Sequence, residues 1–353
     1  MPQTTLSDYK NNLFSNHFLE ERIQEMDEWE ETEVEEQYER LQEEHNQSKR
    51  YLDNNPNESR TWKKIIRPLV KMLGHHPEPE PEHESGLNPD YTLFRDGNEF
   101  LDAKDDEAEF ERAYGILEIK RWGRKFDKSS REGDKDDNSN PAYQTYNYVD
   151  RLRVPWGILT DGKKWRLYSY EKCGKKIFFE IDLVDSIILE QDEEKAKRNF
   201  KLFYLLFRQQ AFSPKGKGFA DEVLEGTLKY NKQLKENLKK DVYSAVEEAC
   251  KGFFEFTEQE ATKENRELVH DSALTFMYRL LFVMNAESRG LLPVENQTYH
   301  EEYSVQWFQE KTVEKEEIPE FKYNTLGWDR LEKLFKGINS GETLDRDTEI
   351  PPY

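Results

Sequence analysis

The chain has 353 residues, a net charge of −21 and two cysteines, Cys173 and Cys250. This length is enough for about two domains, and so few cysteines exclude a disulfide framework and a cysteine-based zinc site. The first residues are polar and no apolar run is long enough to cross a bilayer. We therefore expect a soluble cytoplasmic protein with no membrane partner.

The acidity is concentrated in two segments. Residues 1–60 and residues 77–114 each carry a net charge of −10, so the rest of the chain sums to about −1. That remainder can present basic surface. The overall charge therefore does not exclude DNA as a partner.

The first sixty residues predict a long amphipathic helix with one apolar stripe among many glutamates. We expect an acidic helical arm over residues 1–60, which Asn54 to Asn57 interrupt. Thr61–Leu73 predicts a second helix, and Pro68 should kink it or shift its start.

The next segment contains His75 and His76 and then a Pro-Glu run over residues 77–82. The run predicts a solvated loop that does not pack. No Cys or His follows the two histidines at a metal-ligand spacing, so we do not expect them to bind metal. Further on, Tyr91–Phe94 and Glu99–Ala103 flank Asp96-Gly97, a pattern that predicts a β-hairpin.

The remaining pattern predicts an α/β (α+β) domain over residues 61–190, a mixed sheet with helices on its faces. Its expected elements are strands at Tyr114–Ile119, Trp156–Thr160, Lys164–Tyr170 and Ile177–Leu183, and a helix from Asn140-Pro141 to about Leu152. Only helical periodicity follows, at Phe200–Phe212, Phe219–Gly252 and Glu264–Arg289. We therefore expect an all-α domain over residues 191–353.

The predicted apolar strand Tyr114–Ile119 contains a charged residue, Glu118, and is followed directly by another, Lys120. Glu118 and Lys120 point to the same side of a strand, and burying them costs several kcal/mol unless they are paired or bind a metal. If Asp90 lies beside them, two carboxylates meet at one point and favour a divalent cation such as Mg²⁺. This combination predicts phosphodiester hydrolysis, with Asp90 and Glu118 as metal ligands and Lys120 orienting the attacking water.

The string Pro89-Asp90 … Glu118-Ile119-Lys120 resembles the PD-(D/E)xK nuclease signature. Gln144-Thr-Tyr-Asn-Tyr148 resembles the Q-x-x-x-Y element that follows it in the nuclease domains of type I and related restriction enzymes. Gln144 and Tyr148 are one helical turn apart, so both can reach the same site. The resemblance implies a PD-(D/E)xK fold and adds these two residues to the catalytic set.

Longer stretches are similar to type IIG restriction–modification enzymes, which join a nuclease, a helical connector and an adenine methyltransferase in one chain. These stretches are Glu118–Asp127, Gly157–Tyr168 and Tyr278–Pro293. The resemblance implies the nuclease and connector parts of such an enzyme. No methyltransferase half and no S-adenosylmethionine site are visible, so a separate methyltransferase or specificity subunit, or a missing C-terminal half, is the expected partner beside double-stranded DNA.

Four cations follow the strand at the point where phosphates would approach the metal, and we expect them to bind DNA: Arg121, Arg124, Lys125 and Lys128. Three alternatives remain open. Asp102-Ala-Lys104 is a second acid-x-Lys pair closer to Asp90. The chain could also be a non-catalytic DNA-binding subunit that docks a methyltransferase, or a protein-interaction module that uses its acidic N-terminal helix.

Overall fold

The computed structural model describes residues 9–52, 56–79, 81, 86–106, 108–128, 140–213, 218–257, 260, 262–307, 325–345 and 348–352. The chain divides into two compact units, residues 1–233 and 234–353. We name them the sheet unit and the helical unit. The division lies inside one long helix, whereas the sequence places a boundary near residue 190. None of the helices in the described part of the chain has the length and hydropathy needed to span a bilayer.

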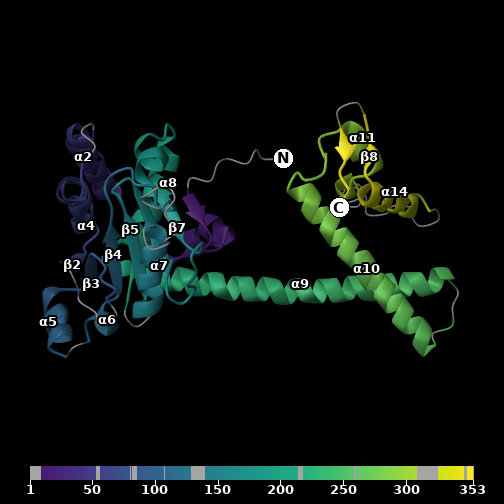
Figure 1. Ribbon diagram of the computed structural model, residues 1–353, viewed down its shortest axis with the longest axis horizontal. Coiled ribbons are helices and arrows are strands. Elements are labelled where there is room, and N and C mark those ends of the chain that lie inside the picture. Colours follow the sequence, from purple (N-terminus) through teal and green to yellow (C-terminus); the bar gives the residue numbers. More distant parts are fainter. Residues whose placement is uncertain are drawn as a thin grey trace. The chain divides into compact units, whose positions relative to one another are not determined.

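The sheet unit is built on a seven-stranded mixed sheet in the order β1-β7-β6-β5-β4-β3-β2 (Figure 1). Strands β4 and β5 pair in parallel and every other neighbouring pair is antiparallel. The expected mixed sheet flanked by helices is thus confirmed. Its strands are β1 (Tyr9–Asn11), β2 (His76–Pro79), β3 (Tyr91–Phe94), β4 (Gly115–Ile119), β5 (Trp156–Thr160), β6 (Lys164–Ser169) and β7 (Phe179–Asp182).

Helices and helical turns cover both faces of this sheet. They are η1 (Phe18–Arg22), η2 (Ile23–Glu25), α1 (Asp27–Glu31), α2 (Glu35–Leu52), α3 (Glu58–Thr61), η3 (Trp62–Ile66), α4 (Arg67–Met72), α5 (Gly97–Asp105), α6 (Glu109–Arg112), α7 (Pro141–Leu152), η5 (Val184–Ile188), α8 (Glu193–Phe207), η6 (Gln209–Ala211) and the first turns of α9 (Phe219–Thr257), whose residues from Leu234 onward belong to the helical unit. Leu117 and Ile119 of β4 belong to the larger core with α2, α4 and α8. Ile116 belongs to the smaller core with α7. Alternate residues of β4 therefore point to opposite faces.

The sequence predicts one long helix in the N-terminal segment, but the structure divides this segment into separate helices and turns. Met26 and Thr32 adopt extended backbone angles at the two ends of α1. The apolar stripe is nevertheless buried, because Leu19, Ile23 and Leu41 all belong to the larger core of the sheet unit. Most acidic side chains of these helices are exposed.

The predicted helix Thr61–Leu73 consists of more than one helical segment, in keeping with the break expected at Pro68. A π-helical turn, η3, leads into α4, and Pro68 lies in the first turn of α4, where its missing N–H costs nothing. His75 then folds into the core, 5 % exposed. Its ring nitrogens lie 2.7 Å from the Tyr114 hydroxyl and 2.6 Å from the Phe207 carbonyl oxygen, so its role is structural.

Two further predictions are wrong. The Pro-Glu run is not entirely an unpacked loop, since His76–Pro79 forms the edge strand β2 against β3; prolines are tolerated at such an edge. Glu80 and residues 82–85 lie outside the described residues. The predicted hairpin at Asp96-Gly97 is instead the start of α5, because Asp96 Oδ1 accepts the N–H groups of Asn98 and Glu99 and so caps a helix.

Helix α7 joins the parallel strands β4 and β5 and packs very closely on the sheet. Asn140 caps it by accepting two backbone N–H groups, as its Asn-Pro start predicts. A Cβ atom at Gly157 of β5 would overlap Cγ2 of Val149 on α7. Gly157 therefore sets how near α7 lies to β5, and with it the placement of the side chains that α7 carries.

We expect Gly157→Ala to destabilise the sheet unit by about 1–3 kcal/mol, because the added methyl group overpacks the contact with α7. Urea denaturation measures the change. Gly97→Ala is the matched control, since no atom lies within 4 Å of its added Cβ. Equal stability of both variants would show that α7 can shift without cost.

The helical unit has its own small core. Its elements are the end of α9, α10 (Lys263–Ser288), α11 (Gln297–Glu302), α14 (Leu326–Ser340) and a two-residue ribbon of β8 (Glu342–Thr343) and β9 (Glu349–Ile350). The ribbon departs from the predicted all-α character. Buried Glu287 connects α10 with the segment that contains α11, because it accepts hydrogen bonds from the Tyr299 hydroxyl and the backbone N–H of Val305.

Candidate active site

The register of β3 and β4 brings Asp90 beside Glu118. Tyr91 pairs with Leu117, so the residue before Tyr91 lies next to the residue after Leu117. The Asp90 backbone N–H donates to Glu118 Oε2 at 3.2 Å, and Asp90 Oδ2 accepts the Ile119 N–H at 2.8 Å. Each carboxylate, 28 positions from the other in the sequence, is thus held by a backbone N–H of the opposite segment, Glu118 by Asp90 and Asp90 by Ile119.

Lys120 completes the arrangement, which we name the acid–lysine cluster: Asp90, Glu118 and Lys120. Its ammonium group pairs with Glu118 Oε1 and lies 3.9 Å from Asp90 Oδ2. The side chains of Glu118, Lys120 and Asp90 are 1 %, 15 % and 34 % exposed. The cluster is therefore closed at Glu118 and open to solvent at Asp90.

Burial governs the charge of this cluster. Desolvation, aided by the charge of Asp90, raises the pKa of Glu118 to about 7, although Lys120 opposes the shift. Burial also disfavours the charged form of Lys120, but Glu118 and Asp90 outweigh it and raise the pKa of the lysine. Lys120 is therefore protonated at neutral pH, whereas Glu118 is poised between its two forms.

Helix α7 places Gln144 and Tyr148 at the same site. Gln144 Nε2 donates to the Tyr148 hydroxyl oxygen at 2.8 Å. Tyr148 is 7 % exposed; burial and then the charge of Glu118 raise the pKa of its phenol. The hydroxyl thus stays protonated near neutral pH and lies within electrostatic reach of Glu118.

Residues 121–128, which we name the basic loop, leave β4 directly after Lys120. Arg121, Lys125 and Lys128 are exposed, and Arg124 is partly buried. Arg124 Nη2 donates to the Lys128 carbonyl oxygen at 2.9 Å. Trp122, the one tryptophan of this loop, is partly buried, whereas Trp156 and Trp165 belong to the core.

The alternative acid-x-Lys pair has no comparable setting. Asp102 and Lys104 are exposed on helix α5. Residues two apart on a helix point to opposite sides. Asp102 and Lys104 therefore cannot face one site together, as Glu118 and Lys120 do.

The structure adds one acid that sequence reasoning missed. Glu58, the first residue of α3, has its pKa raised by partial burial and by Asp90, while Lys120 and a hydrogen bond with the Arg121 backbone oppose that shift. It therefore lies within electrostatic reach of the acid–lysine cluster. The available signal was Asn57-Glu58, an N-cap followed by an acid, which marks a helix start and not a site.

The donor set is compatible with Mg²⁺. The described residues contain no group of three or more His, Cys, Asp or Glu arranged for a metal ion. Mg²⁺, however, usually keeps several waters and binds through one or two carboxylates together with substrate phosphate. The partly exposed Asp90 and the buried Glu118 supply such a pair, and Lys120 would have to leave Glu118 Oε1 for a cation to bind there.

We expect Mg²⁺ affinity to fall as the pH drops below about 7, the pKa of Glu118. The cation requires the ionised carboxylate, so each unit of lower pH should cost up to about tenfold in affinity, with release of a proton on binding. Calorimetric titrations between pH 6 and 8, in buffers of different ionisation enthalpy, measure both effects. Constant affinity and no proton release over this range would contradict the role of Glu118.

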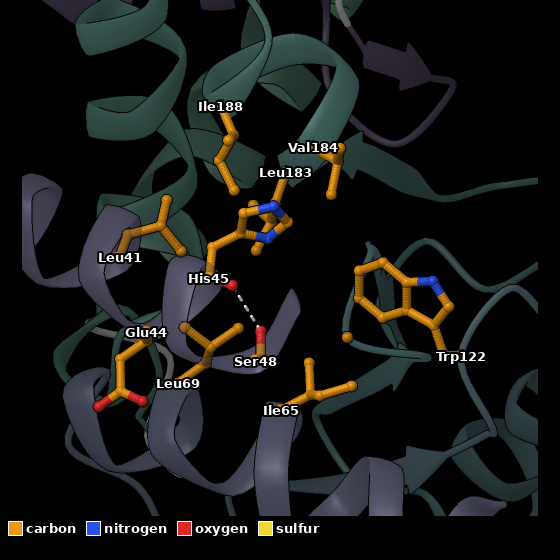
Figure 2. A pocket seen from close by; sticks show the side chains of 11 residues that line it. Leu41, Glu44, His45, Ser48, Ile65, Leu69, Trp122, Leu183, Val184 and Ile188 are labelled. Carbon is orange, nitrogen blue, oxygen red and sulfur yellow. Dashed lines mark hydrogen bonds between the residues drawn. The ribbon is translucent and has the colours of Figure 1, made fainter. Parts of the chain in front are cut away.

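Trp122 is one of the residues that line a separate small pocket (Figure 2). Its volume is about 20 Å³, which is room for about one water molecule. His45 of α2 points into it, and Leu41, Ile65 and Trp122 are among the side chains around it. The pocket contains none of the residues of the acid–lysine cluster, so it is a packing gap between α2, η3 and the basic loop.

Comparisons of the chain with protein-family models, curated proteins and solved structures gave no match. The site must therefore be interpreted from its own geometry.

Proposed function

We propose that the sheet unit is a Mg²⁺-dependent DNA endonuclease module of a restriction–modification system, acting in the cytoplasm. The observation that carries the proposal is the acid–lysine cluster: a buried glutamate, a solvent-facing aspartate and a lysine at the carboxyl end of a central strand. Burying these charges costs several kcal/mol, and catalysis gives that cost a function. The PD-(D/E)xK resemblance of the same three residues supports the assignment.

In this proposal Asp90 and Glu118 hold Mg²⁺. When bound, Mg²⁺ would supply a polarised phosphoryl oxygen and a water of lowered pKa. Lys120 orients that water or meets the charge that develops on the scissile phosphate as the P–O bond breaks. Tyr148, oriented by Gln144, donates a hydrogen bond at the same site.

The basic loop supplies the contacts to the DNA backbone. Phosphate contacts through Arg121, Arg124, Lys125 and Lys128 give sequence-independent, salt-sensitive affinity for double-stranded DNA. The helical unit corresponds in this proposal to the connector of type IIG enzymes, whose partner is an adenine-specific methyltransferase.

The alternative function is a non-catalytic DNA-binding and assembly subunit that docks a separate adenine-specific DNA methyltransferase. One observation favours it: Lys120 already pairs with Glu118 Oε1 and Asp90 Oδ2, so the two acids share a positive partner without a metal ion. In that case the cluster would be a structural ion pair.

Nicking of supercoiled plasmid in the presence of Mg²⁺ separates the two functions. The endonuclease proposal expects the wild-type chain to nick the plasmid and Glu118→Gln to lose nicking. Asp102→Asn, which alters the alternative acid-x-Lys pair, serves as the control and should remain active. Nicking by Glu118→Gln at the wild-type rate would refute the proposed site, and loss in Asp102→Asn alone would move it to α5.

A further inference from the structure

A buried arginine lies in the same row of the sheet as Glu118. Glu118 of β4 pairs with Leu159 of β5, and Leu159 pairs with Arg166 of β6. Directly paired residues point to the same face of a sheet, and two strand spacings separate the outer residues by roughly 10 Å. Arg166 therefore shares the face that carries the candidate site, but it is 1 % exposed and cannot touch a ligand there.

Arg166 is held rigidly from the β7 side. Its Nε donates to Glu180 Oε2 at 2.7 Å, and its guanidinium lies 3.8 Å from the centre of the Phe178 ring. From this position Nη1 and Nη2 donate to the two carboxylate oxygens of Asp127 at 2.8 and 2.9 Å. Such a two-point bond fixes both the position and the orientation of the carboxylate.

Asp127 connects the buried Arg166 side chain with the surface of the protein. Its side chain is 63 % exposed, and it lies in the basic loop between Lys125 and Lys128. A hydrogen bond with Arg166 lowers the pKa of Asp127 despite partial burial. The bond thus persists at any pH near neutrality.

The other end of the basic loop has its own anchor. Gly123 adopts a φ of +74°, which favours glycine, and its N–H donates to Asp161 Oδ2 at 3.0 Å. Asp161 is 1 % exposed and also accepts the Lys163 N–H at the turn between β5 and β6. One hairpin therefore fixes the basic loop at both ends, through Asp161 and Arg166.

We propose that Arg166, through its bidentate bond to Asp127, positions the basic loop so that its cations meet the phosphates of DNA bound at Glu118. The inference rests on the proposed function, since it assumes that the loop binds DNA. Arg166 is in this account a positioning residue and not a catalytic one, because it is buried and acts through the basic loop, where it bonds Asp127 and lies over the Phe126 ring.

We expect Asp127→Asn to weaken DNA binding, which is the opposite of what its change of charge alone would do. Asp127→Asn removes a negative charge beside four cations, so charge alone would strengthen DNA binding. Loss of the charge-assisted bond instead frees the loop. We therefore expect affinity to fall, on the order of tenfold, and the dependence of log K on log salt to become less steep by about 1 as a phosphate contact is lost.

Two variants serve as controls. Asp127→Glu keeps a carboxylate for Arg166 and should restore most of the affinity, which a role in charge alone or in general stability would not explain. Asp185→Asn changes a carboxylate that is 62 % exposed, close to the exposure of Asp127. Lys163 donates two hydrogen bonds of 3.0 and 2.9 Å to it. Among the described residues Asp185 pairs with Lys163 rather than with a residue of the basic loop, so this variant should leave DNA binding unchanged.

The experiment is a fluorescence anisotropy titration of the full chain against duplex DNA without Mg²⁺, at several KCl concentrations. Trypsin digestion of the same samples should cleave after Lys125 and Lys128 faster in Asp127→Asn than in wild type. If wild type binds DNA and Asp127→Asn binds equally, more tightly, or with an unchanged salt dependence, the inference about Arg166 is overturned while the proposed function stands. If wild type does not bind DNA, both are overturned.

Discussion

Lys120→Met should reduce the rate of DNA cleavage by on the order of 10³-fold while Mg²⁺ binding persists. The variant keeps both carboxylates, so the cation retains its ligands, but it removes the ammonium that orients water or stabilises the transition state. Glu118 loses its partner and takes up a proton more readily, so the binding comparison belongs above pH 8. Single-turnover cleavage with saturating enzyme measures the chemical step.

Lys163→Met is the matched control for this substitution. Lys163 also pairs with two carboxylates, Asp182 at 3.4 Å and Asp185 at 2.9 Å, but it lies outside the acid–lysine cluster. We expect its cleavage rate to remain that of wild type. Equal losses in the two variants would mean that a general change of charge, and not the position of Lys120, explains the effect.

Arg166→Met should cause the largest loss of stability, about 3–5 kcal/mol, because it leaves a buried carboxylate without its main partner. That carboxylate is Glu180, 4 % exposed. For a domain of this size the loss corresponds to a decrease in Tm of roughly 6–20 °C. Thermal unfolding followed by circular dichroism measures it.

Lys10 provides the comparison for Arg166, since it pairs with the same Glu180 at 3.1 Å but is 65 % exposed. We expect Lys10→Met to cost less than about 1 kcal/mol, as exposed ion pairs do. The double variant Arg166→Met/Glu180→Gln should recover part of the stability, because no buried charge is then left unpaired. Similar losses in Lys10→Met and Arg166→Met would contradict the importance of burial.

The sequence predicts the central elements of the sheet unit well because their signals are local. Trp156–Thr160 is a short, mainly apolar run without charged residues between turn residues, and it forms β5 with those bounds. Asn140-Pro141 combines a capping side chain with a proline that needs no N–H donor, and α7 begins there. The parallel pairing of β4 and β5 follows from the helix between them.

Errors arise where one signal has two structural meanings. Asp96-Gly97 is typical of a tight hairpin turn, yet Glu99 lies three residues after Asp96, which is the spacing of a helix cap. The structure has that cap, since Glu99 Oε2 accepts the Arg95 N–H while Asp96 caps the helix start. The spacing was available in the sequence and favours the helix.

Other features cannot be predicted from local pattern at all. Arg166 and Glu180 are 14 positions apart, and their contact depends on the register of β6 and β7. Glu58 comes within reach of Asp90 only through the tertiary placement of α3. The pairing of Asp90 with Glu118 can be predicted only in part. The motif is visible in the sequence, but the contact depends on the register of β3 and β4.

Calorimetric titration of Mg²⁺ into wild type and Glu118→Gln, at pH 8, tests the central claim most directly. Glutamine keeps the size of the side chain but cannot supply the ionised oxygen that the cation requires. The account predicts binding to wild type with about one Mg²⁺ per chain at the acid–lysine cluster, and loss of that binding in Glu118→Gln. Equal binding by both proteins, or no binding by wild type, would contradict it.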